Sequence, residues 1–419
     1  MIGVITASPL SPGHKPIILG IFAVTYVGIA IGRFPGLKLN RTGIALLGAI
    51  GMMIFGGVTT ADVISYINWP TIFLLFGFFV ISAQLRLSGF YNKVAEGISA
   101  RLDHPARFLL VLMAVTGGLS AFLNHDIVCY VFAPIVGTAL LRKRLNPVPF
   151  LIALAIASNI GAAATLIGNP QNMMIGQVAG LDFGRYLLWS IGPVVFGMGS
   201  AYGIIWMMSR KKIVLPLPPQ TALDGQSYPY NGRHTIKGLV ILVVVIGLFF
   251  SRVPKEVIAL AAAGIHLASP KFRTEDLLGL VEWPILVLFM GLFVVTGSFQ
   301  ATGYGDQAVQ WLARGGVDIE APRNLTLATA VFSNLIGNSA AVMLLLKVVN
   351  LSQTAAYILA LANSFGGSLI IVGSISNIIV VQQARELGIK ISFWDFARLG
   401  IPVTLAALGG LLGWLALLN

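Results

Sequence analysis

The chain has 419 residues, of which 57% are hydrophobic and 10% are charged, and its formal net charge is +12. So few charges over this length exclude a soluble globular protein and indicate an integral membrane protein. Several apolar runs of about 18 to 22 residues are long enough to cross the hydrocarbon core as helices. The sequence lacks the alternation over about ten residues that marks a transmembrane β-barrel. We therefore predict an all-α polytopic membrane protein.

Membrane topology explains the excess of basic residues better than nucleic-acid binding does. Lys and Arg collect on the cytoplasmic loops of inner-membrane proteins. If the loop at 34–41 is cytoplasmic, most basic residues, including Lys38, Arg41 and Arg142, fall on the inner side, and a few, such as Lys255, fall outside. We predict a multi-pass protein of the cytoplasmic (inner) membrane, in contact with lipid and with no nucleic-acid partner.

The spanning candidates form two similar series. In the first series we expect helices at 16–33, 42–58, 69–88 and 187–208, an interrupted stretch at 105–141 and a broken segment at 148–178. In the second series we expect helices at 237–251, 255–268, 283–300 and 396–418, an interrupted stretch at 322–350 and a broken segment at 355–383.

The two series have the same order of segments and share sequence motifs. Trp69-Pro70 recurs as Trp283-Pro284, a separation of about 214 residues that marks an internal repeat. A polar, proline-rich stretch divides the copies, which predicts a first repeat at 1–208, a cytoplasmic linker at 209–236 and a second repeat at 237–419. About five crossings plus one re-entrant hairpin in each half would invert the second half relative to the first.

Four polar breaks interrupt the apolar segments. They are two hairpin tips, around Asn124 and Asn338, and two broken helices, around Gly168 and Gly373. Unpaired peptide groups are costly in hydrocarbon, so such breaks must line a buried or watery cavity near the midplane of the membrane. Paired breaks in two halves indicate the binding site of a transporter. The predicted substrate- and ion-binding set is Ser120, Asn124, His125, Asp126, Thr165, Gly168, Asn169, Asn172, Ser333, Asn338, Ser339, Gly373, Ser374, Ser376 and Asn377.

His125 and Asp126 are the most distinctive members of this set. Ionisable residues at membrane depth are costly and usually functional, and an imidazole beside a carboxylate can carry a coupled proton. A solvated helix cap at the mouth of the hairpin is the alternative. An intramembrane hydrolase is disfavoured, because the chain has no HExxH or GxSxG motif and a hydrolase would not explain the repeat. The single Cys129 excludes a disulfide and a cysteine-based metal site, so we predict no enzyme, no cofactor and no metal.

The broken segment Thr165–Asn172 resembles a signature of the ion transporter superfamily, and the resemblance extends over the whole chain. The most similar branches are the arsenite permeases and the anion permeases related to the divalent anion/sodium symporters. Gly337-Asn338-Ser339 is similar to the serine-asparagine-threonine motif of that superfamily. At the first tip, an ungapped alignment places His125 on the asparagine of the motif, whereas the repeat offset pairs Asn124 with Asn338. Both registers remain open from the sequence.

The resemblance implies a fold of two inverted repeats that form a scaffold and a moving transport domain, an elevator-type arrangement. The scaffold would comprise 16–88 and 237–300, and the transport domain 105–208 and 322–419. It also implies a homodimer and, for an arsenite pump, a soluble ATPase partner. Histidine in place of the motif's asparagine favours proton coupling over sodium coupling.

The sequence as a whole predicts a secondary active transporter of a small inorganic oxyanion or its neutral acid. Arsenite or antimonite efflux by proton antiport is the leading hypothesis. The four breaks carry no clustered pair of Arg or Lys that would bind a dianion. Sodium-coupled uptake of a dicarboxylate or sulfate is the alternative, followed by sodium/proton exchange.

Overall fold

Every regular element in the computed structural model is helical, over the residues that it describes: 12–32, 38–99, 102, 104–212, 228–269, 271–315 and 318–418. The predicted linker at 209–236 lies partly outside these residues. Six described helices are long and apolar enough to cross a membrane: α4 (Trp69–Leu87), α6 (Pro105–Phe122), α7 (His125–Arg142), α10 (Phe183–Ser209), α14 (Trp283–Ala301) and α20 (Phe393–Leu418). The prediction of an all-helical polytopic membrane protein is therefore confirmed.

The remaining helices divide into two kinds. The apolar or buried ones are α1 (Lys15–Ile31), α2 (Arg41–Phe55), α8 (Val148–Ala162), α9 (Pro170–Val178), α11 (Gly232–Leu248), α12 (Lys255–Leu267), α16 (Pro322–Ile336), α17 (Asn338–Val348), α18 (Gln353–Gly366) and α19 (Ile375–Glu386). The short connecting helices are α3 (Thr60–Tyr66), α5 (Phe90–Ser99), α13 (Thr274–Gly279) and α15 (Tyr304–Arg314). A search of the sequence for apolar runs of membrane-spanning length does not find them.

The helices stop at the four breaks that the sequence indicates. Asn124 separates α6 from α7 as the N-cap, and its Oδ1 accepts a hydrogen bond from the Asp126 N–H at 2.9 Å. Gly337 takes the equivalent place before α17, with a φ of +84° that favours glycine. Because Asn124 and Gly337 both precede the first residue of a helix, His125 corresponds to Asn338. The caps therefore support the ungapped register and not the one that pairs Asn124 with Asn338.

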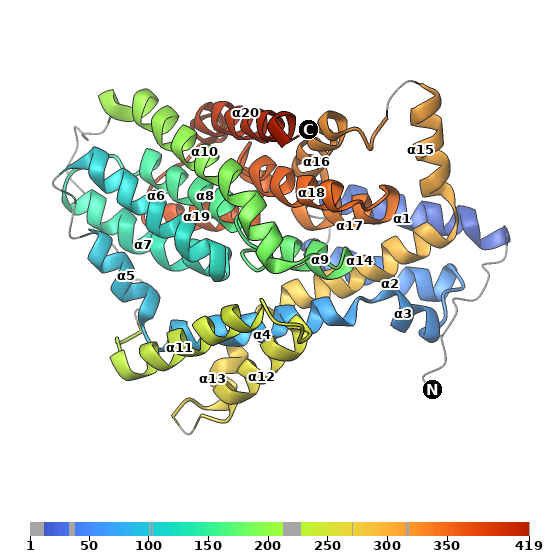
Figure 1. Cartoon of the computed structure of the whole chain (residues 1–419), viewed down its shortest axis with the longest axis horizontal. Helices are drawn as coiled ribbons and strands as arrows, with labels where there is room; N and C mark the ends of the chain where they lie inside the picture. Colours follow the sequence, from blue (N-terminus) through green and yellow to red (C-terminus); the bar gives the residue numbers. More distant parts are fainter. Residues whose placement is uncertain are drawn as a thin grey trace.

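The helices gather into two groups (Figure 1). In the first group α4 packs on α12 and α2 packs on α14, with α1 and α11 alongside. In the second group α6 packs on α8, α16 on α18, α7 on α19 and α10 on α20. The two groups meet where α9 contacts α4, α17 contacts α14 and α16 contacts α1. The four breaks all lie in the second group.

Glycines allow the same close crossings in both halves. A Cβ on Gly77 would lie 2.7 Å from the Ala259 backbone, and one on Gly291 would lie 2.9 Å from the Ala45 backbone. A Cβ on Gly161 would lie 2.3 Å from the Gly117 backbone. Small residues at such crossings let membrane helices approach until their backbones touch. Equivalent glycines therefore position α4 against α12 and α14 against α2, and Gly161 positions α8 against α6.

We predict that Gly161→Ala destabilises the protein while Gly118→Ala does not. The added methyl group at position 161 overlaps the α6 backbone, whereas a Cβ on Gly118 meets nothing within 4 Å. Overpacking of this kind typically costs about 1–3 kcal/mol. Thermal unfolding of the two variants in detergent, followed by tryptophan fluorescence, measures the difference. Equal melting temperatures would contradict the close approach of α8 and α6.

Candidate functional site

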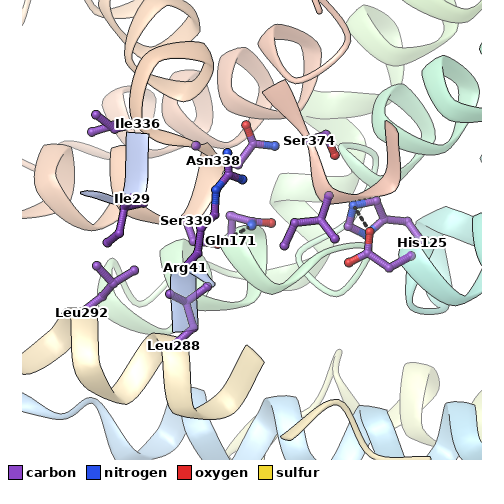
Figure 2. A pocket seen from close by; sticks show the side chains of 14 residues that line it. Ile29, Arg41, His125, Gln171, Leu288, Leu292, Ile336, Asn338, Ser339 and Ser374 are labelled. Atoms are coloured by element: carbon purple, nitrogen blue, oxygen red, sulfur yellow. Dashed lines mark hydrogen bonds and ion pairs between the residues drawn. The ribbon is translucent and has the colours of Figure 1, made fainter. Parts of the chain in front are cut away.

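The breaks of both halves line one small cavity of about 30 Å³ (Figure 2). Its polar wall includes His125 and Asp126 from α7, Gln171 from α9, Asn338 and Ser339 from α17, and Ser374 before α19. Its apolar wall includes Ile29, Leu288 and Leu292 from the other helix group. One water molecule occupies about 10–15 Å³ on this measure, so the cavity has room for about two.

Two hydrogen bonds that join the first half of the chain to the second involve equivalent positions of the repeat. Asn169 Nδ2 donates to Ser364 Oγ at 3.0 Å, and Ser374 Oγ donates to Asn159 Oδ1 at 2.9 Å. When Gly161 is aligned with Gly366, Asn169 corresponds to Ser374, and Asn159 corresponds to Ser364. Each half therefore uses its broken helix to contact the same position in the other half.

A second pair joins the broken helices to the hairpin tips. Gln171 Nε2 donates to Ser339 Oγ at 2.8 Å, and Ser376 Oγ donates to Asp126 Oδ1 at 2.5 Å. Gln171 corresponds to Ser376, and Ser339 corresponds to Asp126, in the alignments given above. The second contact is charge-assisted when Asp126 is ionised and is the stronger type of hydrogen bond. Each tip is thus fixed by the broken helix of the opposite half.

Asn172 and Asn377 support the backbone of the breaks and do not line the cavity. Asn172 Nδ2 donates to the Thr165 carbonyl at 3.1 Å and to the Ala162 carbonyl at 3.4 Å. Asn377 Nδ2 donates to the carbonyls of Ile370 and Gly367 at 2.9 and 2.7 Å. These amides pair carbonyl groups that the end of a helix leaves free.

The predicted glycines and hydroxyl residues also have structural contacts. A Cβ on Gly168 would lie 2.2 Å from the Ala162 carbonyl oxygen, and one on Gly373 would lie 2.4 Å from Asn334 Oδ1. Ser120 Oγ donates to Ser158 Oγ at 3.3 Å, and Ser333 Oγ donates to the Ala330 carbonyl at 3.1 Å. Thr165 Oγ1 donates to the Ala121 carbonyl, which ties the first broken helix to the first hairpin.

His125 and Asp126 are buried, not a solvated cap. Their exposed fractions are 5% and 4%, and His125 Nε2 lies 3.6 Å from Asp126 Oδ1. His125 Nδ1 has no hydrogen-bond partner among the described residues. The carboxylate is thus held by one short hydrogen bond from Ser376 and lies beside the imidazole of His125.

Sequence reasoning missed Arg41. This residue begins α2 in the first helix group, yet its guanidinium lines the cavity and lies against the second tip (Figure 2). A Cβ on Gly337 would lie 3.4 Å from Arg41 Nη1 and 3.5 Å from its Cζ. No local signal distinguishes Arg41 from the other basic residues of a cytoplasmic loop. Only the packing of the two groups brings it to the site.

Several buried amide atoms near the second tip lack partners in the described part of the chain. They are Asn334 Oδ1, Asn338 Oδ1 and both side-chain polar atoms of Asn363. Buried polar groups in native proteins are almost always paired, so such atoms mark a place for water, an ion or a solute. Asn338 combines this property with a position on the cavity wall.

A larger cavity, of about 770 Å³, lies between α4 and α5 on one side and α7 on the other. Arg86 from α4, Tyr130 from α7 and Arg142 at the end of α7 line it. The Arg86 guanidinium lies over the Tyr130 ring at 4.6 Å and the Tyr228 ring at 5.9 Å, which is cation–π geometry. This wide space, the vestibule, is also lined by Lys143, which follows Arg142 at the end of α7.

Glu282, just before α14, is a second acidic group close to the site. Burial raises the pKa of Glu282, the Asp126 charge raises it further, and the Arg86 charge lowers it. The Glu282 carboxyl group is therefore close enough to Asp126 and Arg86 to be influenced by the charges of both.

A helical membrane fold with paired breaks around a small polar cavity defines a secondary transporter. A model of the citrate transporter family matches residues 26–357, and the chain belongs to this family of the ion transporter superfamily. The predicted membership of that superfamily is therefore confirmed.

The relatives are transporters too. An uncharacterized transporter of Mycobacterium tuberculosis is 30% identical over 93% of this chain and 96% of its own length. The silicon efflux transporter LSI3 of Oryza sativa subsp. japonica is 24% identical over 92% and 94% of the two chains. A protein of Dictyostelium discoideum named as an arsB transporter is 31% identical over 39% of this chain and 29% of its own length.

Among solved structures, the YdaH transporter of Alcanivorax borkumensis superimposes with a TM-score of 0.58 at 14% identity, covering 97% of this chain and 98% of that one. This likeness concerns the fold. The family also agrees with the prediction that the protein is not an enzyme.

We predict that Asn338→Ala and Asn172→Ala have different consequences. Asn338→Ala removes a cavity-lining amide and should weaken solute binding about tenfold or more at nearly unchanged thermal stability. Asn172→Ala leaves backbone carbonyls unpaired and should lower the melting temperature, at a cost of about 1–3 kcal/mol. Transport kinetics and thermal unfolding of both variants separate these effects. Equal melting temperatures, or an unchanged KM in Asn338→Ala, would contradict the assignment.

Proposed function

We propose that the protein exports a small, uncharged hydroxy acid in exchange for protons, with arsenous or antimonous acid as the leading substrate. The observation that carries the proposal is the small cavity, in which a buried carboxylate–imidazole pair faces amides and hydroxyls. Such a wall can donate hydrogen bonds to the oxygen atoms of the solute and accept them from its hydroxyl groups.

The size of the cavity supports a solute of few heavy atoms. Room for about two water molecules suits arsenous acid with a modest adjustment of the walls and is far too small for a tricarboxylate in this conformation. Arsenous acid is mostly uncharged near neutral pH, so it needs hydrogen-bonding groups and no paired cations. The unpaired Asn338 Oδ1 is an acceptor placed for one of its hydroxyl groups.

The relatives support the same class of substrate. LSI3 is named as a silicon efflux transporter, and silicic acid is also a small hydroxy acid without charge at neutral pH. The Dictyostelium discoideum relative named as an arsB transporter is 31% identical over 39% of this chain. Export of such an acid by this chain would use an inward proton gradient across the cytoplasmic membrane.

The proposed mechanism uses two inverted repeats, 1–208 and 237–419, joined by a cytoplasmic linker at 209–236. The first helix group (α1, α2, α4, α11, α12 and α14) is the scaffold, and the second group (α6–α10 and α16–α20) is the transport domain. The repeated hydrogen bonds between Asn169 and Ser364 and between Ser374 and Asn159 support this division, because they bind both halves of the second group into one body. Movement of that body as an elevator would carry the site across, and a homodimer would anchor the scaffold.

Within this mechanism Asp126 and His125 carry the proton. A protonated Asp126 is neutral and can cross the low-dielectric interior, whereas the bare carboxylate cannot cross without a partner. Ser376 donates to Asp126 Oδ1 at 2.5 Å and so holds the carboxylate toward the cavity, where the solute binds. Solute and proton therefore use neighbouring positions.

Sodium-coupled uptake of a dicarboxylate or sulfate is the second candidate. Its support is the description of the family as citrate transporters and the presence of one guanidinium, that of Arg41, at the cavity. A dianion would pair one of its charges with Arg41 and would require a wider cavity than the one observed.

Uptake into everted membrane vesicles separates the two candidates. Acid inside the vesicles should drive accumulation of arsenite without sodium if the protein is a proton antiporter. Sodium-dependent movement of succinate or sulfate, with no arsenite signal, would replace the first candidate by the second. Vesicles from cells without the protein provide the background.

We predict that Asp126→Asn reduces proton-driven uptake to background without loss of folded protein, because the amide keeps the shape and cannot release a proton. Asp182→Asn is the matched control, since Asp182 caps α10 by accepting from the Arg185 N–H at 2.8 Å, away from the cavity. Full proton-dependent uptake by Asp126→Asn would remove Asp126 from the mechanism.

A further inference from the structure

Gln171 is a cavity-lining residue that the predicted binding set omits. It is the second residue of α9, and its exposed fraction is 7%. Its Nε2 donates to Ser339 Oγ at 2.8 Å, which joins the two halves of the chain. Its Oε1 accepts no hydrogen bond from the described residues, and it is not one of the fully buried unpaired atoms. This carbonyl oxygen therefore opens onto the small cavity that Gln171 lines (Figure 2).

The hydroxyl group of Ser339 completes the arrangement. A serine hydroxyl can accept hydrogen bonds and also donate one. Ser339 Oγ accepts from Gln171 Nε2, and its own O–H donates to no acceptor in the described part of the chain. Ser339 lines the same cavity as Gln171. Gln171 Oε1 and the Ser339 O–H therefore present one acceptor and one donor, side by side, to the cavity.

An acceptor beside a donor is complementary to a hydroxyl group. The O–H of a solute can donate to Gln171 Oε1 while its oxygen accepts from Ser339. An ionised oxygen can only accept, so it would leave Oε1 unpaired and would place two electron-rich oxygen atoms face to face. Leaving a buried acceptor unpaired costs more free energy than a typical hydrogen bond contributes. The pair therefore distinguishes a protonated oxygen from an ionised one.

The repeat provides an internal comparison for Gln171. The equivalent residue of the second half is Ser376, whose hydroxyl donates to Asp126 Oδ1 at 2.5 Å. Ser376 is fully buried and does not line the small cavity. The longer glutamine side chain thus gives the first broken helix a side-chain carbonyl oxygen in the cavity, which the second broken helix lacks.

The other polar residues of the wall do not make this distinction. Arg41 is basic and Asp126 is acidic, and both line the cavity, so the charges of the wall do not by themselves select one form of the solute. Asn338 carries both a donor and an acceptor, and its side chain can serve either form. Gln171 cannot adapt in this way, because its amide nitrogen is committed to Ser339.

We propose that Gln171 is a specificity-determining residue, which restricts the cavity to solutes that present a protonated hydroxyl group to Gln171 and Ser339. The solutes of this class are small neutral polyhydroxy acids, such as arsenous, silicic and boric acids. Ionised oxyanions such as sulfate are rejected. The inference rests on the proposed function, because it explains the substrate class of that function through one side chain.

Equilibrium binding near neutral pH tests the proposal. Isothermal titration calorimetry of the purified protein in detergent gives the dissociation constants of arsenous acid, boric acid and sulfate. Boric acid is included because it presents hydroxyl groups and does not bind thiols, so Cys129 cannot imitate the effect. Gln171→Met removes the carbonyl oxygen and keeps the length of the side chain. It should weaken binding of both neutral acids on the order of tenfold and leave sulfate binding unchanged or tighter.

Two further variants isolate the carbonyl oxygen. Gln171→Glu keeps an acceptor oxygen at the cavity and can accept from the Ser339 O–H, so it should bind the neutral acids more tightly than Gln171→Met does and should weaken sulfate binding further. Gln177→Met is the matched control on the same helix, because Gln177 Nε2 donates to Glu256 Oε2 at 3.3 Å, away from the small cavity. It should leave all three dissociation constants unchanged.

An equal loss of binding for the neutral acids and for sulfate in Gln171→Met would overturn the proposal, because a purely structural role affects every ligand alike. Unchanged binding of the neutral acids in that variant would overturn it too. Failure of the proposed function gives a different result, which is a parent protein that binds sulfate and neither neutral acid. The role of Gln171 is then retained if Gln171→Met tightens sulfate binding about tenfold and is rejected if it does not. A parent protein that binds none of the three ligands would overturn both proposals.

Discussion

The structure depends on one constraint, which is that peptide groups freed by a broken helix must find partners inside the membrane. Such groups cost several kcal/mol when they remain unpaired in hydrocarbon. The side-chain amides of Asn172 and Asn377 meet this demand by donating to carbonyls within their own breaks. The breaks can then present other side chains to a cavity. Support of the backbone and lining of the cavity are therefore divided between neighbouring residues of the same segment.

The two halves keep the same framework and differ in chemistry. Equivalent contacts join α9 to the second tip and α19 to the first tip, so the cavity has a nearly symmetric frame. The first tip nevertheless carries His125 and Asp126 where the second carries Asn338 and Ser339. One half thus supplies ionisable groups and the other supplies neutral hydrogen-bonding groups. This difference is what the proposed exchange of a proton for a neutral hydroxy acid requires.

Local patterns predicted the helices and the breaks well, because long apolar runs and polar interruptions leave a direct trace in the sequence. The same patterns selected more residues than those that line the small cavity, which are His125, Asp126, Asn338, Ser339 and Ser374 of the predicted set. Ser120, Thr165, Gly168 and Asn377 stand out in the sequence because they are polar or small at membrane depth, but in the structure they serve close packing and backbone pairing. A polar residue in an apolar segment indicates that the residue has a role there. Polarity alone does not show whether that role is to support the backbone or to line the cavity.

The sequence by itself determined the helical membrane fold, the internal repeat, the four breaks and the adjacent histidine and aspartate at the first tip, since each depends on composition or on residues close together in the chain. Tertiary structure alone decided which of the polar residues face the cavity and that Arg41 meets the second tip. A hydrogen bond such as that from Ser376 to Asp126 joins residues 250 positions apart. Contacts of this kind are set by how the helix groups pack, and no local pattern records them.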